Sequence, residues 1–103
     1  IKFSAQKNCN GYVIIENYQV IAYGSIFYEI KIRGGKVGHI EDIVVKKSHR
    51  GKDIGKLLIN HLIERAIENG CYKVSLECKE INEVFYKKCG FEVNGISMSK
   101  ILL

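Results

Sequence analysis

The sequence predicts an α/β chain of the mixed, α+β type, in which residues 1–103 form one domain. Runs of β-branched and aromatic residues before position 46 predict strands, and one long segment with helical periodicity follows them. After that segment, apolar and polar residues alternate again. The predicted order is β-β-β-α-β-α-β, which favours a sheet with both antiparallel and parallel neighbours. A length of 103 residues fits one domain.

The first half of the chain predicts an antiparallel hairpin followed by a central strand. The hairpin extends from Gly11 to Lys31 and turns at residues 16–19. Gly24 interrupts its second strand, which indicates a bulge or a close approach by another element. A glycine-containing turn follows at residues 33–36, and Gly38 to Val45 is then predicted as a strand because it ends in a β-branched run.

The second half predicts one long helix, a strand, a short helix and a last strand. Apolar residues recur at helical spacing from Gly55 to Asn69, and Gly70 is placed to end this helix. Residues 72–78 alternate, as a strand does. A short helix is expected from Asn82, its N-cap, to Cys89. Residues 91–103 predict the last strand.

The composition fits a globular domain without a membrane segment. Hydrophobic residues make up 47% of the chain and charged residues 26%, and no apolar run reaches the roughly 20 residues of a membrane span. The net charge of +5 could indicate nucleic-acid binding. However, 13 of the 16 basic residues are Lys, which fits a compositional bias and small anionic ligands better. We expect a cytoplasmic protein that binds neither nucleic acid nor membrane.

The cysteines and histidines predict neither a disulfide nor a metal site. Cys9, Cys71, Cys78 and Cys89 form no C-x-x-C pair, and no Cys/His set has zinc-ligand spacing. We therefore expect buried free thiols in a reducing compartment, and no metal.

The segment from Lys46 to Gly55 joins a strand to a helix and has the features of a phosphate site. Glycines let the backbone approach a ligand, amide N–H groups point outward, and the helix N-terminus adds partial positive charge. Arg50, Lys52 and Lys56 add full charges. The turn contains neither G-x-x-x-x-G-K-[ST] nor G-x-G-x-x-G, so it is not one of the common nucleotide-binding loops.

The turn Arg50-Gly51-Lys52-Asp53-Ile54-Gly55 resembles the R/Q-x-x-G-x-G/A signature of the GNAT superfamily of N-acetyltransferases. Asp53 replaces the middle glycine. The resemblance implies an acyl-CoA N-acyltransferase fold and acetyl-CoA as co-substrate. It also implies that the family's N-terminal strand and helices are shortened or missing, since only ten residues precede the hairpin.

Three further blocks are similar to one branch of that superfamily, the glucosamine 6-phosphate N-acetyltransferases. They are residues 38–45 (G-H-I-E-D-I-V-V), 70–74 (G-C-Y-K-V) and 82–91 (N-E-V-F-Y-K-K-C-G-F). This similarity implies acetyl transfer to the amine of glucosamine 6-phosphate, giving N-acetylglucosamine 6-phosphate for UDP-GlcNAc synthesis. It also implies a homodimer that pairs near Ile96 to Leu103.

Acetyl transfer from a thioester to an amine needs a neutral amine, a stabilised oxyanion and a proton for the leaving thiolate. The resemblance assigns the thiolate's proton to Tyr86, although a helix tyrosine can equally be a packing residue. Glu77 could orient the amine or accept its proton, and its alternative is an ion pair with Lys73 or Lys79.

The resemblance also divides the other candidate residues between the two substrates. Adjacent strand residues point to opposite faces, so Glu41 and Asp42 can serve one ligand only if the strand bulges there. The residues expected to bind the sugar phosphate are Glu41, Asp42, Lys31 and Lys73. The residues expected to bind acetyl-CoA are Ile43, Val44, Val45, Arg50, Gly51, Lys52, Asp53, Ile54, Gly55, Lys56, Asn82 and Tyr86.

Two other functions stay open on the sequence. One is a GNAT enzyme that acetylates a protein or another small amine. The other belongs to a different class: Gly35-Lys36-Val37-Gly38 is formally a G-x-x-G, as in small RNA-binding modules that clamp the RNA backbone.

Overall fold

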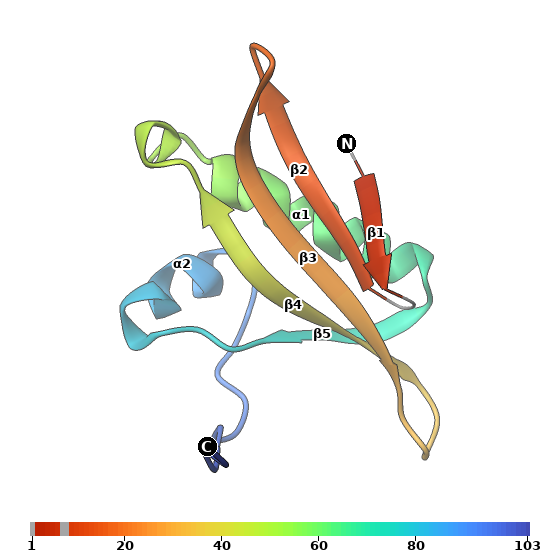
Figure 1. The fold of residues 1–103 in the computed structure, drawn as a ribbon. Helices are drawn as coiled ribbons and strands as arrows, with labels where there is room; N and C mark the ends of the chain where they lie inside the picture. The colour runs from red at the N-terminus through yellow and green to blue at the C-terminus, as the bar shows by residue number, and fades with distance from the viewer. Residues whose placement is uncertain (1, 7–8) are drawn as a thin grey trace.

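A computed structural model describes residues 2–6 and 9–103, with side chains from Asn10 onward (Figure 1). The predicted α/β architecture with a mixed sheet is confirmed. Its elements are β1 (Lys2–Gln6), β2 (Cys9–Glu16), β3 (Gln19–Ile30), β4 (Lys36–Val45), α1 (Ile54–Glu68), β5 (Cys71–Leu76) and α2 (Glu83–Lys88). Two short 3₁₀ helices lie at Lys47–His49 and Glu80–Asn82.

The five strands follow chain order across the sheet, β1-β2-β3-β4-β5. All neighbours are antiparallel except β4 and β5, which are parallel because α1 carries the chain back between them. Strand β1 was not predicted. The β4–β5 ladder runs from Lys36 opposite Cys71 to Ile40 opposite Leu76. Beyond that pair the two strands diverge toward α2 (Figure 1), and this divergence positions the candidate site.

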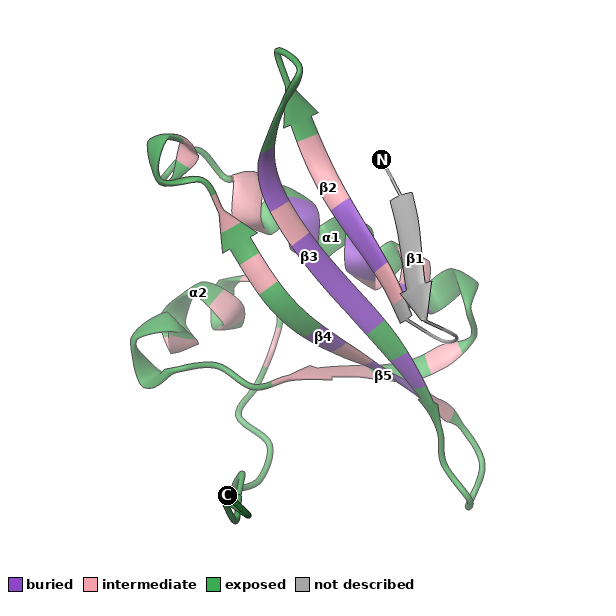
Figure 2. Ribbon diagram, viewed as in Figure 1, coloured by how far each residue is buried: buried purple, intermediate pink, exposed green. Residues whose placement is uncertain are grey.

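Helix α1 covers one face of the sheet and forms the core with it. Figure 2 shows the buried residues concentrated where β2, β3 and α1 meet. The fully buried side chains include Ile26 from β3 and Leu58, Ile59 and Leu62 from α1. The predicted apolar stripe is narrower than expected, because Ile67 is exposed on the last turn of α1. Gly70 ends the helix with a positive φ, as predicted.

Gly24 allows β3 to approach both β4 and α1. A Cβ at this position would lie 2.7 Å from Ile43 Cδ1 and 3.1 Å from Leu58 Cδ2. The β3–β4 register also shifts between Tyr23 and Ser25. The prediction of a bulge or close approach at Gly24 is therefore confirmed.

The prediction of a last strand at residues 91–103 was wrong. Residues 91–103 form neither helix nor strand, and Ile96 and Met98 are each 90% exposed. A strand needs a neighbour to pair with, and no described strand of the same chain pairs with this segment. Apolar alternation alone was therefore insufficient to predict a strand here.

Candidate active site

A groove of about 1520 Å³ opens where β4 and β5 diverge. Residues from β4, β5, α2 and the segment after α2 line it. Of the predicted site residues, the groove brings together Glu41, Asp42, Ile43, Lys73, Glu77 and Tyr86. Beyond Ile40 no described strand pairs with the β5 side of β4, so alternate β4 amides face this opening.

A bulge in β4 presents two adjacent carboxylates to the groove. Asp42 has a positive φ of 55°. In the β3–β4 ladder Glu41 pairs with Ser25 and Val44 pairs with Tyr23. Two β4 residues therefore lie between these pairs but only one β3 residue, which defines the bulge. The Ser25 hydroxyl, buried beside the bulge, donates a hydrogen bond of 3.1 Å to the Glu41 carbonyl. Glu41 and Asp42 are both exposed and both line the groove. The bulge is the condition that the sequence analysis set for both residues to serve one ligand. Sequence reasoning missed Ser25.

The turn from Arg50 to Lys56 leaves a row of backbone amides unpaired. The first hydrogen bond of α1 runs from the Leu57 amide to the Asp53 carbonyl, over 3.0 Å. Among the described residues, the amides of positions 51–56 have no hydrogen-bond partner. The predicted cofactor residues Arg50, Gly51, Lys52, Asp53, Ile54, Gly55 and Lys56 form this turn. Unpaired amides at a helix N-terminus favour a bound anion.

Asp53 occupies the position of the missing glycine and adopts a glycine-like backbone. It has φ of 60° and ψ of 16°, in the left-handed region, and its side chain makes no capping bond to α1. Asp is among the few non-glycine residues that tolerate this region. The turn therefore keeps the left-handed backbone without the glycine, and it places a carboxylate at the N-terminal end of α1.

Two residues of the turn have a structural role that the sequence did not predict. The Arg50 Nε donates to the Val45 carbonyl over 3.1 Å, which ties the turn to the end of β4. A Cβ on Gly55 would lie 3.1 Å from Phe85 Cζ and 3.8 Å from Val45 Cγ2. The small size of Gly55 thus lets α2 pack against the start of α1, whereas the sequence suggested only room for a phosphate.

Tyr86 lies half-buried on α2 and borders the groove. Its ring makes edge-to-face contacts with Phe85, at 5.0 Å between centroids, and with Phe91, at 6.0 Å. Burial raises the pKa of Tyr86, and Cys78 and Cys89 add to the rise. The phenol therefore keeps its proton at neutral pH.

Glu77 follows β5 directly and lies exposed at the groove. Its Oε1 accepts a hydrogen bond of 3.1 Å from the Ser97 hydroxyl. The alternative ion pair with Lys73 or Lys79 does not form among the side chains described. Apart from this hydrogen bond, Glu77 forms no ion pair among the described side chains.

Besides the turn at residues 50–56, four predicted residues lie outside the groove lining, and a fifth, Lys73, lines the groove with a contact that was not predicted. Lys31 pairs with Glu29, at 3.1 Å. Val44 and Val45 continue β4 past the groove and pair with β3. Asn82 holds the N-cap position of α2 but makes no capping bond, so that detail of the prediction was wrong. Lys73 does line the groove, with its Nζ 5.8 Å from the Tyr72 ring centroid.

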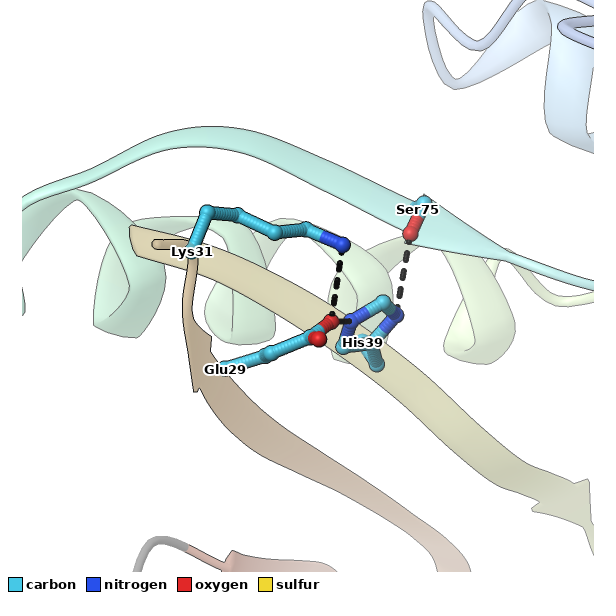
Figure 3. Close-up of polar contacts among 4 residues, drawn as sticks. All are labelled: Glu29, Lys31, His39 and Ser75. Carbon is cyan, nitrogen blue, oxygen red and sulfur yellow. Dashed lines mark hydrogen bonds and ion pairs between the residues drawn. The ribbon is translucent and has the colours of Figure 1, made fainter. Parts of the chain in front are cut away.

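Sequence reasoning also missed His39 and Ser75, which line the same groove. The Ser75 hydroxyl lies 3.1 Å from His39 Nδ1, and His39 Nε2 lies 2.8 Å from Glu29 Oε1 (Figure 3). The spacing carried a signal, because His39 and Ser75 each precede a candidate carboxylate, Glu41 or Glu77, by two strand positions.

The thiols agree only in part with the prediction of buried cysteines. Cys71, Cys78 and Cys89 are free, but Cys78 is exposed and the other two are half-buried. Burial raises the pKa of the Cys71 and Cys89 thiols. Cys9 lies outside the described side chains. Within the described residues there is no group of three or more potential metal ligands, and no helix is long and apolar enough to cross a bilayer.

Comparison with known proteins gives consistent matches. A family model described as the acetyltransferase (GNAT) family matches residues 2–91. The glucosamine 6-phosphate N-acetyltransferase 1 of Dictyostelium discoideum is 51% identical over 83 residues, which are 79% of this chain and 53% of that protein. The corresponding Candida albicans enzyme is 49% identical over 81 residues, which are 77% and 54% of the two chains.

A solved structure agrees with these matches. The crystal structure of glucosamine-6-phosphate N-acetyltransferase from Arabidopsis thaliana matches with a TM-score of 0.87 and 41% identity, over 92% of this chain and 67% of that one. The predicted resemblance to this family is therefore confirmed. The chain spans about half the length of the two relatives above.

Proposed function

We propose that this chain, which belongs to the GNAT family of acetyltransferases, transfers the acetyl group of acetyl-CoA to the amine of glucosamine 6-phosphate. The product would be N-acetylglucosamine 6-phosphate, a precursor of UDP-GlcNAc. The observation that carries the proposal is the groove, which collects Glu41, Asp42, Glu77 and Tyr86 from three separate elements. Relatives named for this reaction are 51% and 49% identical to the chain.

Acetyl-CoA fits the described geometry in two parts. The unpaired amides of residues 51–56 suit the pyrophosphate, since they combine outward N–H groups with the positive end of α1. The pantetheine arm would then follow β4 along Ile43 to Val45, where alternate amides lack a strand partner. This route leads the thioester into the groove that Tyr86 borders.

The chemistry follows from the charges around the groove. Glu41, Asp42 and Glu77 are exposed carboxylates, and they favour a cationic amine near the thioester. The neutral amine attacks the thioester carbonyl, and Tyr86 donates to the sulfur as the thiolate leaves. Because the pKa of Tyr86 is raised, the phenol is protonated before each turnover.

The sugar phosphate needs a basic contact in a groove that is rich in acids. Lys73 lines the groove and can meet the phosphate. Lys31 is already paired with Glu29 and lies outside the lining residues, so it is the weaker candidate.

We also propose a homodimer in the cytoplasm. The segment 91–103 exposes Ile96, Met98, Ile101 and Leu102 and has no strand partner within the described chain. A second copy could supply that partner. The free thiols fit a reducing compartment. Light scattering at micromolar concentration should give the mass of two chains, and the mass of one chain would contradict the dimer.

The alternative of an RNA-binding module has less support. The G-x-x-G at residues 35–38 leads into β4, and three strands precede it. A Cβ on Gly35 would lie 2.6 Å from Tyr72 Cε1, so an aromatic ring covers this backbone. The other alternative, an enzyme that acetylates protein amines, differs from the proposal only in its acceptor.

An acceptor panel tests the proposal. Thiol release from acetyl-CoA is measured with glucosamine 6-phosphate, with glucosamine and with lysine peptides, while calorimetry measures acetyl-CoA binding in parallel. We expect kcat/KM to be highest for glucosamine 6-phosphate. Faster turnover of peptides would replace the substrate assignment, and acetyl-CoA binding without any transfer to the sugar phosphate would refute the acceptor and leave the cofactor assignment in place.

A further inference from the structure

A chain of polar contacts crosses three strands on the face of the sheet opposite α1. Lys31 Nζ lies 3.1 Å from Glu29 Oε1, and the same oxygen lies 2.8 Å from His39 Nε2. His39 Nδ1 then lies 3.1 Å from the Ser75 hydroxyl (Figure 3). The residues come from the end of β3, from β4 and from β5, so the chain exists only once the sheet has formed.

This series of polar contacts ends among the residues that line the groove. His39 is the register partner of Ser75, one position before the last β4–β5 pair, Ile40 and Leu76. Both His39 and Ser75 line the groove. Glu41 follows two positions later on β4, and Glu77 follows two positions later, directly after the end of β5. The imidazole therefore lines the same groove as the carboxylates that would receive the amine, two strand positions before Glu41.

The contacts define which nitrogen of His39 carries the proton. The pKa of Glu29 is lowered by its hydrogen bond with His39 and by its contact with Lys31, so this carboxylate is ionised and can only accept. His39 Nε2 must therefore be the donor. In the neutral imidazole, Nδ1 then has the free lone pair and accepts from the Ser75 hydroxyl.

We propose that Ser75 and His39 relay the proton of the acceptor's ammonium group away from the groove. The relay rests on the proposed function. One ammonium proton passes to the Ser75 oxygen while the Ser75 hydroxyl proton passes to His39 Nδ1. The products are a neutral amine and an imidazolium paired with Glu29. Between turnovers the imidazolium returns its proton to water. Ser75 contacts the substrate, whereas His39 and Glu29 act through it.

The charged groups around His39 are of both signs. Glu29 contacts the ring directly, and Glu41 and Glu77 lie farther along the groove. The opposing cations are Lys31, which contacts the same carboxylate, and Lys73 on β5. The Phe27 ring, 5.5 Å from the His39 ring, contributes no full charge, and α1 packs on the other face.

A second Ser-His-Glu set offers a matched control. The Ser48 hydroxyl lies 2.9 Å from His49 Nδ1, and His49 Nε2 lies 2.9 Å from Glu16 Oε1. None of these three residues lines the groove. The hydrogen-bond pattern therefore occurs twice, and of the two sets only Ser75-His39-Glu29 reaches the groove, where it could act on an amine.

The test compares pH profiles of kcat with saturating acetyl-CoA and glucosamine 6-phosphate. Glu29→Gln keeps an acceptor for Nε2 but removes the charge that stabilises the imidazolium. It should move the acidic limb of the kcat profile to lower pH by about one unit. His39→Gln should lower kcat by about 10²-fold or more and abolish that limb. The controls Glu16→Gln and His49→Gln should leave the limb where it is.

Overlapping profiles for Glu29→Gln and the parent chain, with turnover in both, would overturn the relay alone. An absence of acetyl transfer by the parent would instead refute the proposed function, and the relay with it. A measurement independent of turnover is the ¹⁵N spectrum of the imidazoles. We expect His39 to be protonated on Nε2 when neutral, and an Nδ1-protonated neutral ring would overturn the relay even if the histidine variants fold poorly.

Discussion

The proposed cofactor side of this site, the turn at residues 50–56, and the proposed acceptor side, the groove between β4 and β5, are built in different ways. The turn at residues 50–56 is continuous in sequence, and its left-handed residues, Gly51 and Asp53, shape the backbone locally. The acceptor side instead collects Glu41, Glu77 and Tyr86 from β4, the end of β5 and α2. A local turn can bind its ligand through backbone amides, whereas the acceptor side depends on strand register and helix packing. Changes should therefore affect the two sides separately.

The largest expected effect is on the acceptor side, with Tyr86→Phe. The ring contacts with Phe85 and Phe91 remain, and only the proton donor is lost. We expect kcat to fall by about 10²–10⁴-fold, the usual range for general acid catalysis, with the Kd for acetyl-CoA unchanged. Tyr18→Phe, on a fully exposed ring, is the control. An unchanged kcat, when chemistry limits the rate, would remove Tyr86 from the mechanism.

Gly55→Val tests whether the two sides are mechanically coupled. The new side chain meets Phe85 on α2, so we expect a stability loss of about 1–3 kcal/mol from overpacking and a lower kcat, because α2 carries Tyr86. Thermal unfolding and turnover are measured. Combining the change with Phe85→Leu should restore much of both. If acetyl-CoA affinity fell equally in both backgrounds, Gly55 would instead act by admitting the phosphate.

Asp53→Gly should improve the cofactor side by a smaller amount. Glycine relieves the left-handed backbone, which favours the folded state by about 1 kcal/mol, and it removes a carboxylate near the proposed site of the pyrophosphate. Asp53→Asn keeps a side chain that tolerates this backbone and removes only the charge. We expect both variants to bind acetyl-CoA about two- to fivefold more tightly, the range for an exposed charge contact. Weaker binding in calorimetry would show that Asp53 assists the cofactor.

The smallest expected effect is the response of Tyr86 to pH. Its pKa is raised, so the protonated donor persists through neutral pH and past the usual phenol value. The kcat profile should therefore show no alkaline limb from Tyr86 below about pH 10. An alkaline limb near pH 8 that disappeared in Tyr86→Phe would contradict this.

The sequence predicted local features, such as the turn, better than features that several distant elements build together. The turn, the long helix and the close approach at Gly24 were predicted from neighbouring residues or from periodicity, and the structure contains all three. The resemblance to a known family identified the carboxylates and Tyr86, and the structure places them along one groove. The roles assigned to those residues remain predictions.

The features that the sequence did not predict depend on distant residues. The contact between His39 and Ser75 requires the β4–β5 register, and the contact of Gly55 with Phe85 requires α2 to fold back. The strand expected at residues 91–103 needs a partner that the described chain lacks. None of these three outcomes follows from local pattern. Lys31 is a different case: the resemblance assigned it to the phosphate, but it pairs with Glu29, two residues before it.

The central claim is that both substrates meet in the groove between β4 and β5. A crystal structure with coenzyme A and N-acetylglucosamine 6-phosphate tests it most directly. We expect the pyrophosphate on the amides of residues 51–56, the pantetheine beside Ile43 to Val45, and the sulfur within hydrogen-bond distance of the Tyr86 hydroxyl. The N-acetyl group should lie between Tyr86 and Glu77. Coenzyme A bound elsewhere, or a sulfur far from Tyr86, would contradict the account.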